Sequence, residues 1–156
     1  MIEIHIPGWG ELALQHLVLD YNGTLACDGA LLPGVADRLR ALSGSIAVRV
    51  LTADTFGTAH AQLEGLPCEV TVPPRGDQAA GKLALVERLG AARTAAVGNG
   101  RIDRPMLERS ALGIAVVLAE GAAAETLAAA DVVCTDINAA LDLLLFPKRL
   151  VATLRS

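Results

Sequence analysis

Short apolar runs alternate with amphipathic segments along most of the chain. The runs at residues 17–19, 46–51, 94–97 and 113–117 are nearly continuous in Val, Leu, Ile and Ala. Runs of this kind are typical of strands covered on both faces, as in a parallel sheet. Weaker apolar runs near Val70 and at residues 131–133 predict two further strands.

Helical periodicity lies between these runs, and the predicted helices cover residues 33–42, 57–66, 78–89, 103–110 and 122–129. Pro33 suits a first helical position, and Gly44 follows the end of that helix. Alternating strands and helices predict an α/β fold, a three-layer α/β/α Rossmannoid with a mostly parallel sheet.

The first residues follow a different pattern. Ile2, Ile4 and Ile6 alternate with polar residues, a Pro-Gly-Trp-Gly turn follows, and Leu12 and Leu14 alternate again, which predicts a β-hairpin over residues 1–16. Trp9 at its tip leaves two interpretations open, contact with a neighbouring subunit or local packing. No linker or repeat interrupts residues 1–156, so we expect one domain.

Composition excludes several classes of protein. Of 156 residues, 53% are hydrophobic and 3% aromatic, and the formal net charge is −4. Such a chain can bury a core but offers neither the basic surface nor the stacking platforms that nucleic acid requires. Because no basic stretch precedes an apolar run and charged residues interrupt the most apolar segment, residues 111–134, we expect no membrane partner and a cytoplasmic location. The three cysteines fit neither a disulfide framework nor a zinc site.

Four polar patches carry the candidate chemistry. They are Asp20 to Thr24, Thr52 to Asp54, Lys82, and Gly98 to Asp103. Ligands of open α/β sheets bind beyond the carboxyl ends of the strands, where three of these patches fall. Each of these residues, considered alone, has a simpler interpretation without catalysis. Asp20 would be a turn residue, Thr52 the end of a strand, Lys82 a solvated surface cation and Asp103 a helix cap. In this order they predict phosphoryl transfer with Mg²⁺ as cofactor.

The same patches resemble the motifs of the haloacid dehalogenase superfamily, and within it the phosphorylation domain of P-type ATPases. Asp20-Tyr-Asn-Gly-Thr is similar to the first motif, and Thr52-Ala-Asp to the ATPase Thr-Gly-Asp. Lys82 matches the third motif, and residues 98–103 (Gly-Asn-Gly-Arg-Ile-Asp) resemble the fourth. The resemblance covers residues 17–150.

The resemblance implies a role for each matching residue. Asp20 is the nucleophile and a metal ligand, and Thr52 and Lys82 hold the phosphoryl oxygens. The Asn22 carbonyl, Asn99 and Asp103 complete the metal site. The remaining motif residues are expected to contact the substrate, and Asp54 is also expected to orient the cluster; they are Gly23, Thr24, Ala53 and Asp54.

Two departures from the family pattern predict slow turnover. Phosphatases of the superfamily carry an aspartate at the position of Asn22, as general acid and base, and such help is worth roughly 10²–10⁴-fold. Asn99 replaces another aspartate and removes one negative charge from the metal site.

The spacing of the motifs leaves no room for a cap. Only 27 residues separate Thr24 from Thr52, and 29 separate Thr52 from Lys82. Each interval is filled by one helix and strand unit, so the site is expected to be open unless a homo-oligomer covers it.

These observations predict a magnesium-dependent phosphatase that forms an aspartyl-phosphate on Asp20 and acts on a phosphorylated small molecule or phosphoprotein. Two alternatives remain, an ATP hydrolase like the membrane relatives and a catalytically degenerate phosphate-binding regulatory module.

Overall fold

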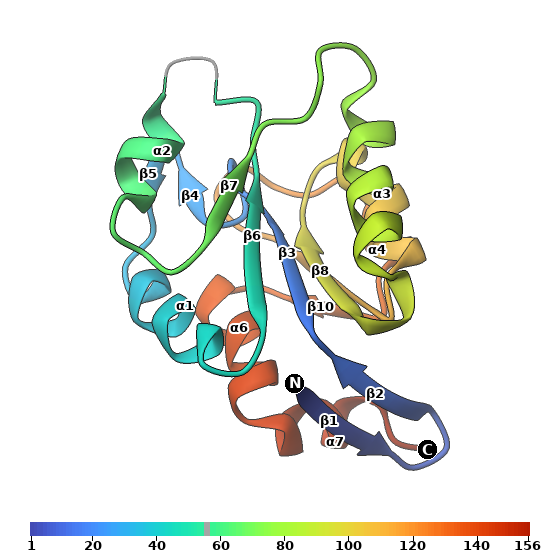
Figure 1. Cartoon of the computed structure of the whole chain (residues 1–156). Helices are drawn as coiled ribbons and strands as arrows, with labels where there is room; N and C mark the ends of the chain where they lie inside the picture. Colours follow the sequence, from blue (N-terminus) through green and yellow to red (C-terminus); the bar gives the residue numbers. More distant parts are fainter. Residues whose placement is uncertain (55–56) are drawn as a thin grey trace.

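A six-stranded parallel sheet forms the centre of the protein, in a computed structural model that describes residues 1–54 and 57–156 (Figure 1). The strand order is β10-β9-β8-β3-β6-β7, and every neighbouring pair is parallel. The strands are β3 (His16–Asp20), β6 (Ala47–Leu51), β7 (Glu69–Thr71), β8 (Thr94–Gly98), β9 (Leu112–Val116) and β10 (Val132–Cys134). This confirms the predicted parallel sheet and the three-layer fold class.

Helices cover both faces of the sheet. They are α1 (Val35–Ser43), α2 (Thr58–Leu63), α3 (Gln78–Leu89), α4 (Arg104–Arg109), α5 (Ala124–Ala129), α6 (Ile137–Leu145) and α7 (Pro147–Leu154), with short 3₁₀ turns η1 (Ala91–Arg93) and η2 (Arg101–Asp103). The apolar side chains of α1 and α6 share one buried cluster with Leu17 and Leu19 of β3. Those of α3 and α4 share the opposite cluster with Val18.

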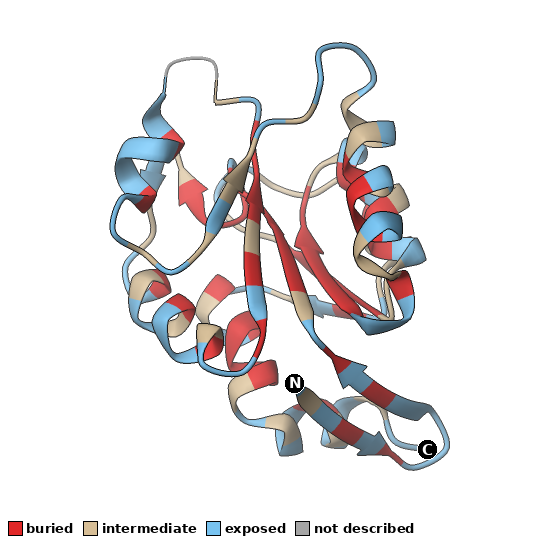
Figure 2. Cartoon of the chain, in the orientation of Figure 1, coloured by how far each residue is buried: buried red, intermediate tan, exposed pale blue. Residues whose placement is uncertain are grey.

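The middle of the sheet is covered on both faces, because successive strand side chains point to opposite sides. All residues of β8 and β9 are buried, as is β3 from Leu17 onward (Figure 2). Burial on both faces explains why these strands read as continuous apolar runs rather than as alternating patterns.

The N-terminal hairpin has the predicted form. Strands β1 (Ile2–Ile6) and β2 (Gly10–Leu14) pair antiparallel, with Ile2 opposite Leu14. Its apolar face is buried at Ile4, Ile6, Leu12 and Leu14, and β1 lies against α7. Trp9 in the turn is 37% exposed.

Some elements have no counterpart in the sequence predictions. A second small hairpin, β4 (Ala26–Cys27) and β5 (Ala30–Leu31), follows β3, and helices α6 and α7 complete the C-terminal part. Two-residue strands are too short to leave a periodic pattern. Within the described residues, none of the helices is both long and apolar enough to cross a membrane.

Candidate active site

Three of the four polar patches meet at the carboxyl edge of the sheet because their strands are neighbours. Strand β3 pairs with β6 on one side and with β8 on the other. Asp20 ends β3, Thr52 follows β6, and Gly98 ends β8. The sheet order therefore brings together residues that are up to 78 positions apart in the sequence.

Lys82 reaches this edge from helix α3 and connects two acids. Its ammonium lies 2.6 Å from Asp20 Oδ1 and 2.6 Å from Asp103 Oδ1. The Lys82 side chain is 2% exposed and that of Asp103 is 1% exposed. A buried charge is tolerated only when it is paired, so this lysine is bound into the site and is not a solvated surface cation.

Asp103 has a partner for each of its carboxylate oxygens. Oδ1 accepts from Lys82, and Oδ2 accepts from the backbone N–H groups of Asn99 and Gly100, at 3.0 and 2.9 Å. Gly98 permits this approach, because a Cβ there would lie 2.6 Å from the Asp103 side chain. The carboxylate thus fixes the loop after β8 and holds Lys82.

Thr24 connects the nucleophile candidate to the same loop. Its hydroxyl lies 3.0 Å from Asp20 Oδ2 and 3.2 Å from Asn99 Oδ1, and the residue is fully buried. We expected Thr24 to contact substrate, whereas the structure turns it inward, where it orients the two acceptor groups. Sequence reasoning offered no signal for this inward orientation.

Gly23 allows the first loop to lie against Asn99. It has a φ of +77°, and a Cβ there would lie 2.4 Å from Asn99 Nδ2. Its N–H donates to the Ala26 carbonyl at 2.9 Å. This donor is therefore committed inside the loop, which leaves Gly23 a structural contribution in place of the expected substrate contact.

The oxygen atoms around Thr24 fit a hard cation such as Mg²⁺. Asp20 Oδ2 and Asn99 Oδ1 converge on one hydroxyl, and Asn22 follows Asp20 by two residues in the same loop. Carboxylate, amide and carbonyl oxygens are the ligands that Mg²⁺ prefers. Within residues 1–54 and 57–156, no group of three His, Cys, Asp or Glu side chains suited to a metal occurs.

A cavity of about 220 Å³ opens above these groups. It is lined by Asp20, Asn22, Thr52, Ala53, Gln78, Lys82, Asn99, Gly100, Ile102 and Asp103. Gln78 belongs to no recognised motif and is placed here only by the fold, and Ile102 lies within the fourth motif although no role was predicted for it. The lining supplies a carboxylate, an ammonium and amide groups around a space suited to a phosphoryl group.

Thr52 lines this cavity with its backbone N–H already occupied. This N–H donates to the Thr71 carbonyl at 3.2 Å as part of the contact between β6 and β7, which leaves the hydroxyl for a phosphoryl oxygen. The hydroxyl oxygen accepts from the Asp54 N–H at 3.2 Å, and its own proton remains available to a ligand.

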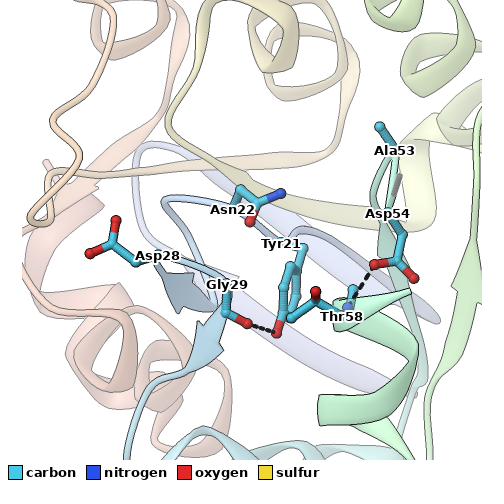
Figure 3. A pocket seen from close by; sticks show the side chains of 8 residues that line it. Tyr21, Asn22, Asp28, Gly29, Ala53, Asp54 and Thr58 are labelled. Carbon is cyan, nitrogen blue, oxygen red and sulfur yellow. Dashed lines mark hydrogen bonds between the residues drawn. The ribbon is translucent and has the colours of Figure 1, made fainter. Parts of the chain in front are cut away.

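Asp54 is directed away from the Asp20 cluster. Its carboxylate accepts the Ala59 N–H at 2.7 Å and also contacts His60, at the start of α2. Burial alone would raise the pKa of Asp54, but the hydrogen bonds from His60 and Ala59 lower it overall. Asp54 instead lines a second cavity beside the first, and Ala53 lines both cavities (Figure 3).

Burial dominates the electrostatics of Asp20. Desolvation, followed by the nearby charge of Asp103, raises the pKa of Asp20 to about 6 against the opposing effect of Lys82. Burial by itself would lower the pKa of Lys82, but the two carboxylates outweigh it and raise that pKa. The cluster therefore holds a permanent cation beside a carboxyl group that is costly to ionise without further positive charge.

Known proteins share this architecture and part of this sequence. An uncharacterized protein of Methanocaldococcus jannaschii, MJ0073, is 42% identical over 84 residues, which are 51% of this chain and 90% of that protein. The 3-deoxy-D-manno-octulosonate 8-phosphate phosphatase of Moraxella catarrhalis superposes with a TM-score of 0.72 at 17% identity, covering 90% of this chain and 93% of that one. That structure holds magnesium, phosphate and KDO.

A proposed HAD superfamily (subfamily III A) hydrolase from Legionella pneumophila superposes equally well, with a TM-score of 0.72 at 18% identity over 90% of this chain and 87% of that one. No model of a known protein family matches the chain. The structural likeness establishes the fold, and the sequence match establishes a relative. The chain thus belongs to one family with MJ0073, and it has the fold of the haloacid dehalogenase superfamily of hydrolases.

Proposed function

We propose that this protein is a divalent-metal-dependent phosphatase that acts through an aspartyl-phosphate on Asp20. The observation that best supports this function is the position of the Lys82 ammonium. It is buried and lies 2.6 Å from both Asp20 and Asp103 at the carboxyl edge of the sheet. Phosphoryl transfer needs a positioned nucleophile and positive charge around the transferred group, and this arrangement supplies both. The fold shared with phosphatases supports the same proposal.

The metal would be held by Asp20, Asn99, Asp103 and the Asn22 carbonyl. When bound, it supplies positive charge that neutralises phosphoryl oxygens and lowers the repulsion between the two anions. It also favours the ionised form of Asp20, whose pKa otherwise stands near 6. We propose Mg²⁺ because every donor in the set is an oxygen.

The chain's own residues then account for the two steps. An Asp20 oxygen forms a bond to phosphorus while the bond from phosphorus to the ester oxygen breaks, and the released alkoxide takes a proton from solvent. In the second step water attacks phosphorus, the bond to Asp20 breaks, and phosphate leaves with Asp20 regenerated. Lys82 and the Thr52 hydroxyl hold the phosphoryl oxygens through both steps.

Asn22 limits the rate of this cycle. It is exposed at the edge of the phosphoryl cavity and carries no titratable proton. Both the departing alkoxide and the attacking water consequently depend on solvent for proton transfer. We propose that turnover is slow and that the aspartyl-phosphate accumulates.

The same observation favours a second candidate function, a module that binds phosphate groups without turnover. One experiment separates the two. The protein is incubated with p-nitrophenyl phosphate and Mg²⁺, and both p-nitrophenol release and an acid-stable, hydroxylamine-labile phosphoprotein are measured. We expect both signals to vanish in Asp20→Asn and to survive in Asp37→Asn, whose side chain is 87% exposed on α1. Absence of both signals from the unmodified chain favours the binding module.

A further inference from the structure

A second cavity adjoins the phosphoryl cavity. It measures about 350 Å³ and is lined by Tyr21, Asn22, Asp28, Gly29, Ala53, Asp54, Thr58 and Ala59 (Figure 3). Asn22 and Ala53 line both cavities, so the two spaces meet at these residues. Its volume is at the lower end of the range of about 300–1,000 Å³ that is usual for small-molecule sites.

The direction of nucleophilic attack indicates which part of the substrate the second cavity would bind. In phosphoryl transfer the attacking and leaving oxygens lie on opposite sides of phosphorus, roughly in line. The resemblance to the superfamily implies that a general acid at the position of Asn22 serves the leaving oxygen, and Asn22 borders both cavities. The alcohol part of a phosphate ester therefore leaves past Asn22, into the second cavity.

The described walls of this cavity carry negative charge only. Two lining residues, Asp28 and Asp54, are acids, and none of the eight lining residues is a lysine, arginine or histidine. Asp54 is occupied by the start of α2. Asp28 is exposed, and within the described part of the chain its carboxylate makes no hydrogen bond or salt bridge.

Asp28 is held in place by the backbone of the small hairpin. It lies between β4 and β5 with a φ of +50°, and the neighbouring Gly29 carbonyl accepts the Tyr21 hydroxyl at 2.8 Å. The negative field extends along the hairpin, since burial and then the charges of Asp28 and Glu120 raise the pKa of Cys27. A carboxylate on a ligand would meet repulsion here, whereas an ammonium would be attracted.

We propose, building on the phosphatase function above, that the substrate is a phosphate ester of an amino alcohol or amino sugar whose ammonium group pairs with Asp28. The phosphoryl group occupies the cavity at Asp20 and Lys82, and the cationic alcohol occupies the second cavity. The cleavage is the one described above, with the alkoxide released into the second cavity and protonated by solvent. Asp28 thereby determines specificity without entering the chemistry.

Three esters that differ mainly in charge test this assignment. They are glucosamine 6-phosphate, glucose 6-phosphate and 6-phosphogluconate, with p-nitrophenyl phosphate as a reference whose leaving group is small and carries no ammonium or carboxylate. We expect kcat/KM to fall in that order for the three sugars, by about fivefold per unit of charge, as for one charge pair in an exposed site. In Asp28→Lys the order of the three sugars, each rate taken relative to that with p-nitrophenyl phosphate in the same variant, is expected to reverse. Asp37→Asn serves as the acidic control remote from the cavity.

Each outcome decides between the two proposals. Equal or better use of 6-phosphogluconate, or an order that Asp28→Lys leaves unchanged, overturns the assignment of the cavity while the phosphatase function stands. If no ester is cleaved, the phosphatase function fails. The affinities of the three sugar phosphates are then measured at equilibrium with Mg²⁺ present. If the order of these affinities changes in Asp28→Lys, the subsite for a cationic group is supported even then. If the order is the same in both proteins, the subsite is overturned.

Discussion

The Lys82 ammonium lies 2.6 Å from the Asp103 carboxylate, and neither side chain is more than 2% exposed. This pair joins helix α3 to the loop after β8, so it couples the packing of the α3 layer to the position of that loop. Its second partner, Asp20, makes the same ammonium part of the proposed reaction centre. Fold and site are thus stabilised by the same charge.

Lys82→Met is expected to destabilise the metal-free protein. The change leaves two buried carboxylates without their cation, and breaking a buried pair in this way costs about 3–5 kcal/mol. Urea unfolding in the presence of EDTA measures the effect. Lys148→Met is the control, because Lys148 is exposed on α7 and is the only other lysine in the sequence. Equal unfolding midpoints for the two variants would contradict the structural importance of the pair.

Thr24→Val is expected to weaken metal binding as well as stability. The valine keeps the volume but removes the hydroxyl that lies between Asp20 and Asn99, and leaving buried acceptors unpaired costs about 1–3 kcal/mol. Thr94→Val is the matched control, since Thr94 is also fully buried and donates one hydrogen bond, to the Gly90 carbonyl at 2.9 Å.

Both threonine variants are expected to lower the unfolding midpoint. Only Thr24→Val is expected to raise the Mg²⁺ concentration needed for half-maximal stabilisation, because Thr94 lies at the opposite end of β8. Calorimetry across a magnesium titration makes the comparison. An unchanged magnesium requirement in Thr24→Val would show that the hydroxyl does not organise the metal ligands.

Asn22→Asp is expected to accelerate turnover. A carboxyl at this exposed position can protonate the leaving alkoxide and later accept a proton from water, and such catalysis is worth roughly 10²–10⁴-fold. Steady-state release of p-nitrophenol and the fraction of phosphorylated protein are measured together. We expect the rate to rise and the phosphorylated fraction to fall. Asn22→Gln keeps the amide and is expected to change neither quantity by more than a few fold, and the absence of a gain in Asn22→Asp would argue for a non-catalytic site.

The metal-free protein is expected to lose stability as the pH rises from 4 to 7. The pKa of Asp20 is raised from 3.8 to about 6 in the folded state, so the folded protein binds the proton more tightly than the unfolded chain. The resulting stabilisation is fully present below about pH 3.8 and is lost as the pH passes through about 6. Thermal unfolding with EDTA at several pH values measures this contribution.

Asp20→Asn supplies the comparison for the pH series, because it removes the titrating group at nearly the same volume. The decline in its melting temperature over this range is expected to be smaller than that of the unmodified chain. Added Mg²⁺ is expected to stabilise the unmodified chain at pH 7.5 more than the variant. A parallel decline in both proteins would assign the pH dependence to other groups.

The positions of strands and helices were readable from the sequence because burial imposes a periodicity. Strand β3 and helix α3 lie where continuous apolar runs and helical spacing predicted them. The small hairpin β4–β5 was not predicted, since its two-residue strands carry no period and depend on the packing around Tyr21. Helix α4 begins at Arg104, after the 3₁₀ turn that places Asp103 against Lys82.

The sequence by itself determined which side chains stand at the ends of the strands, because a motif lies next to its own strand in the chain. It therefore indicated Asp20, Lys82 and Asp103 as one group. Only the tertiary structure decided how their hydrogen bonds are shared, turning Thr24 inward, committing the Thr52 N–H to Thr71 and directing Asp54 toward α2. The second cavity with Asp28 is likewise a product of the tertiary fold, since its walls come from segments that meet only after the sheet and helices have packed.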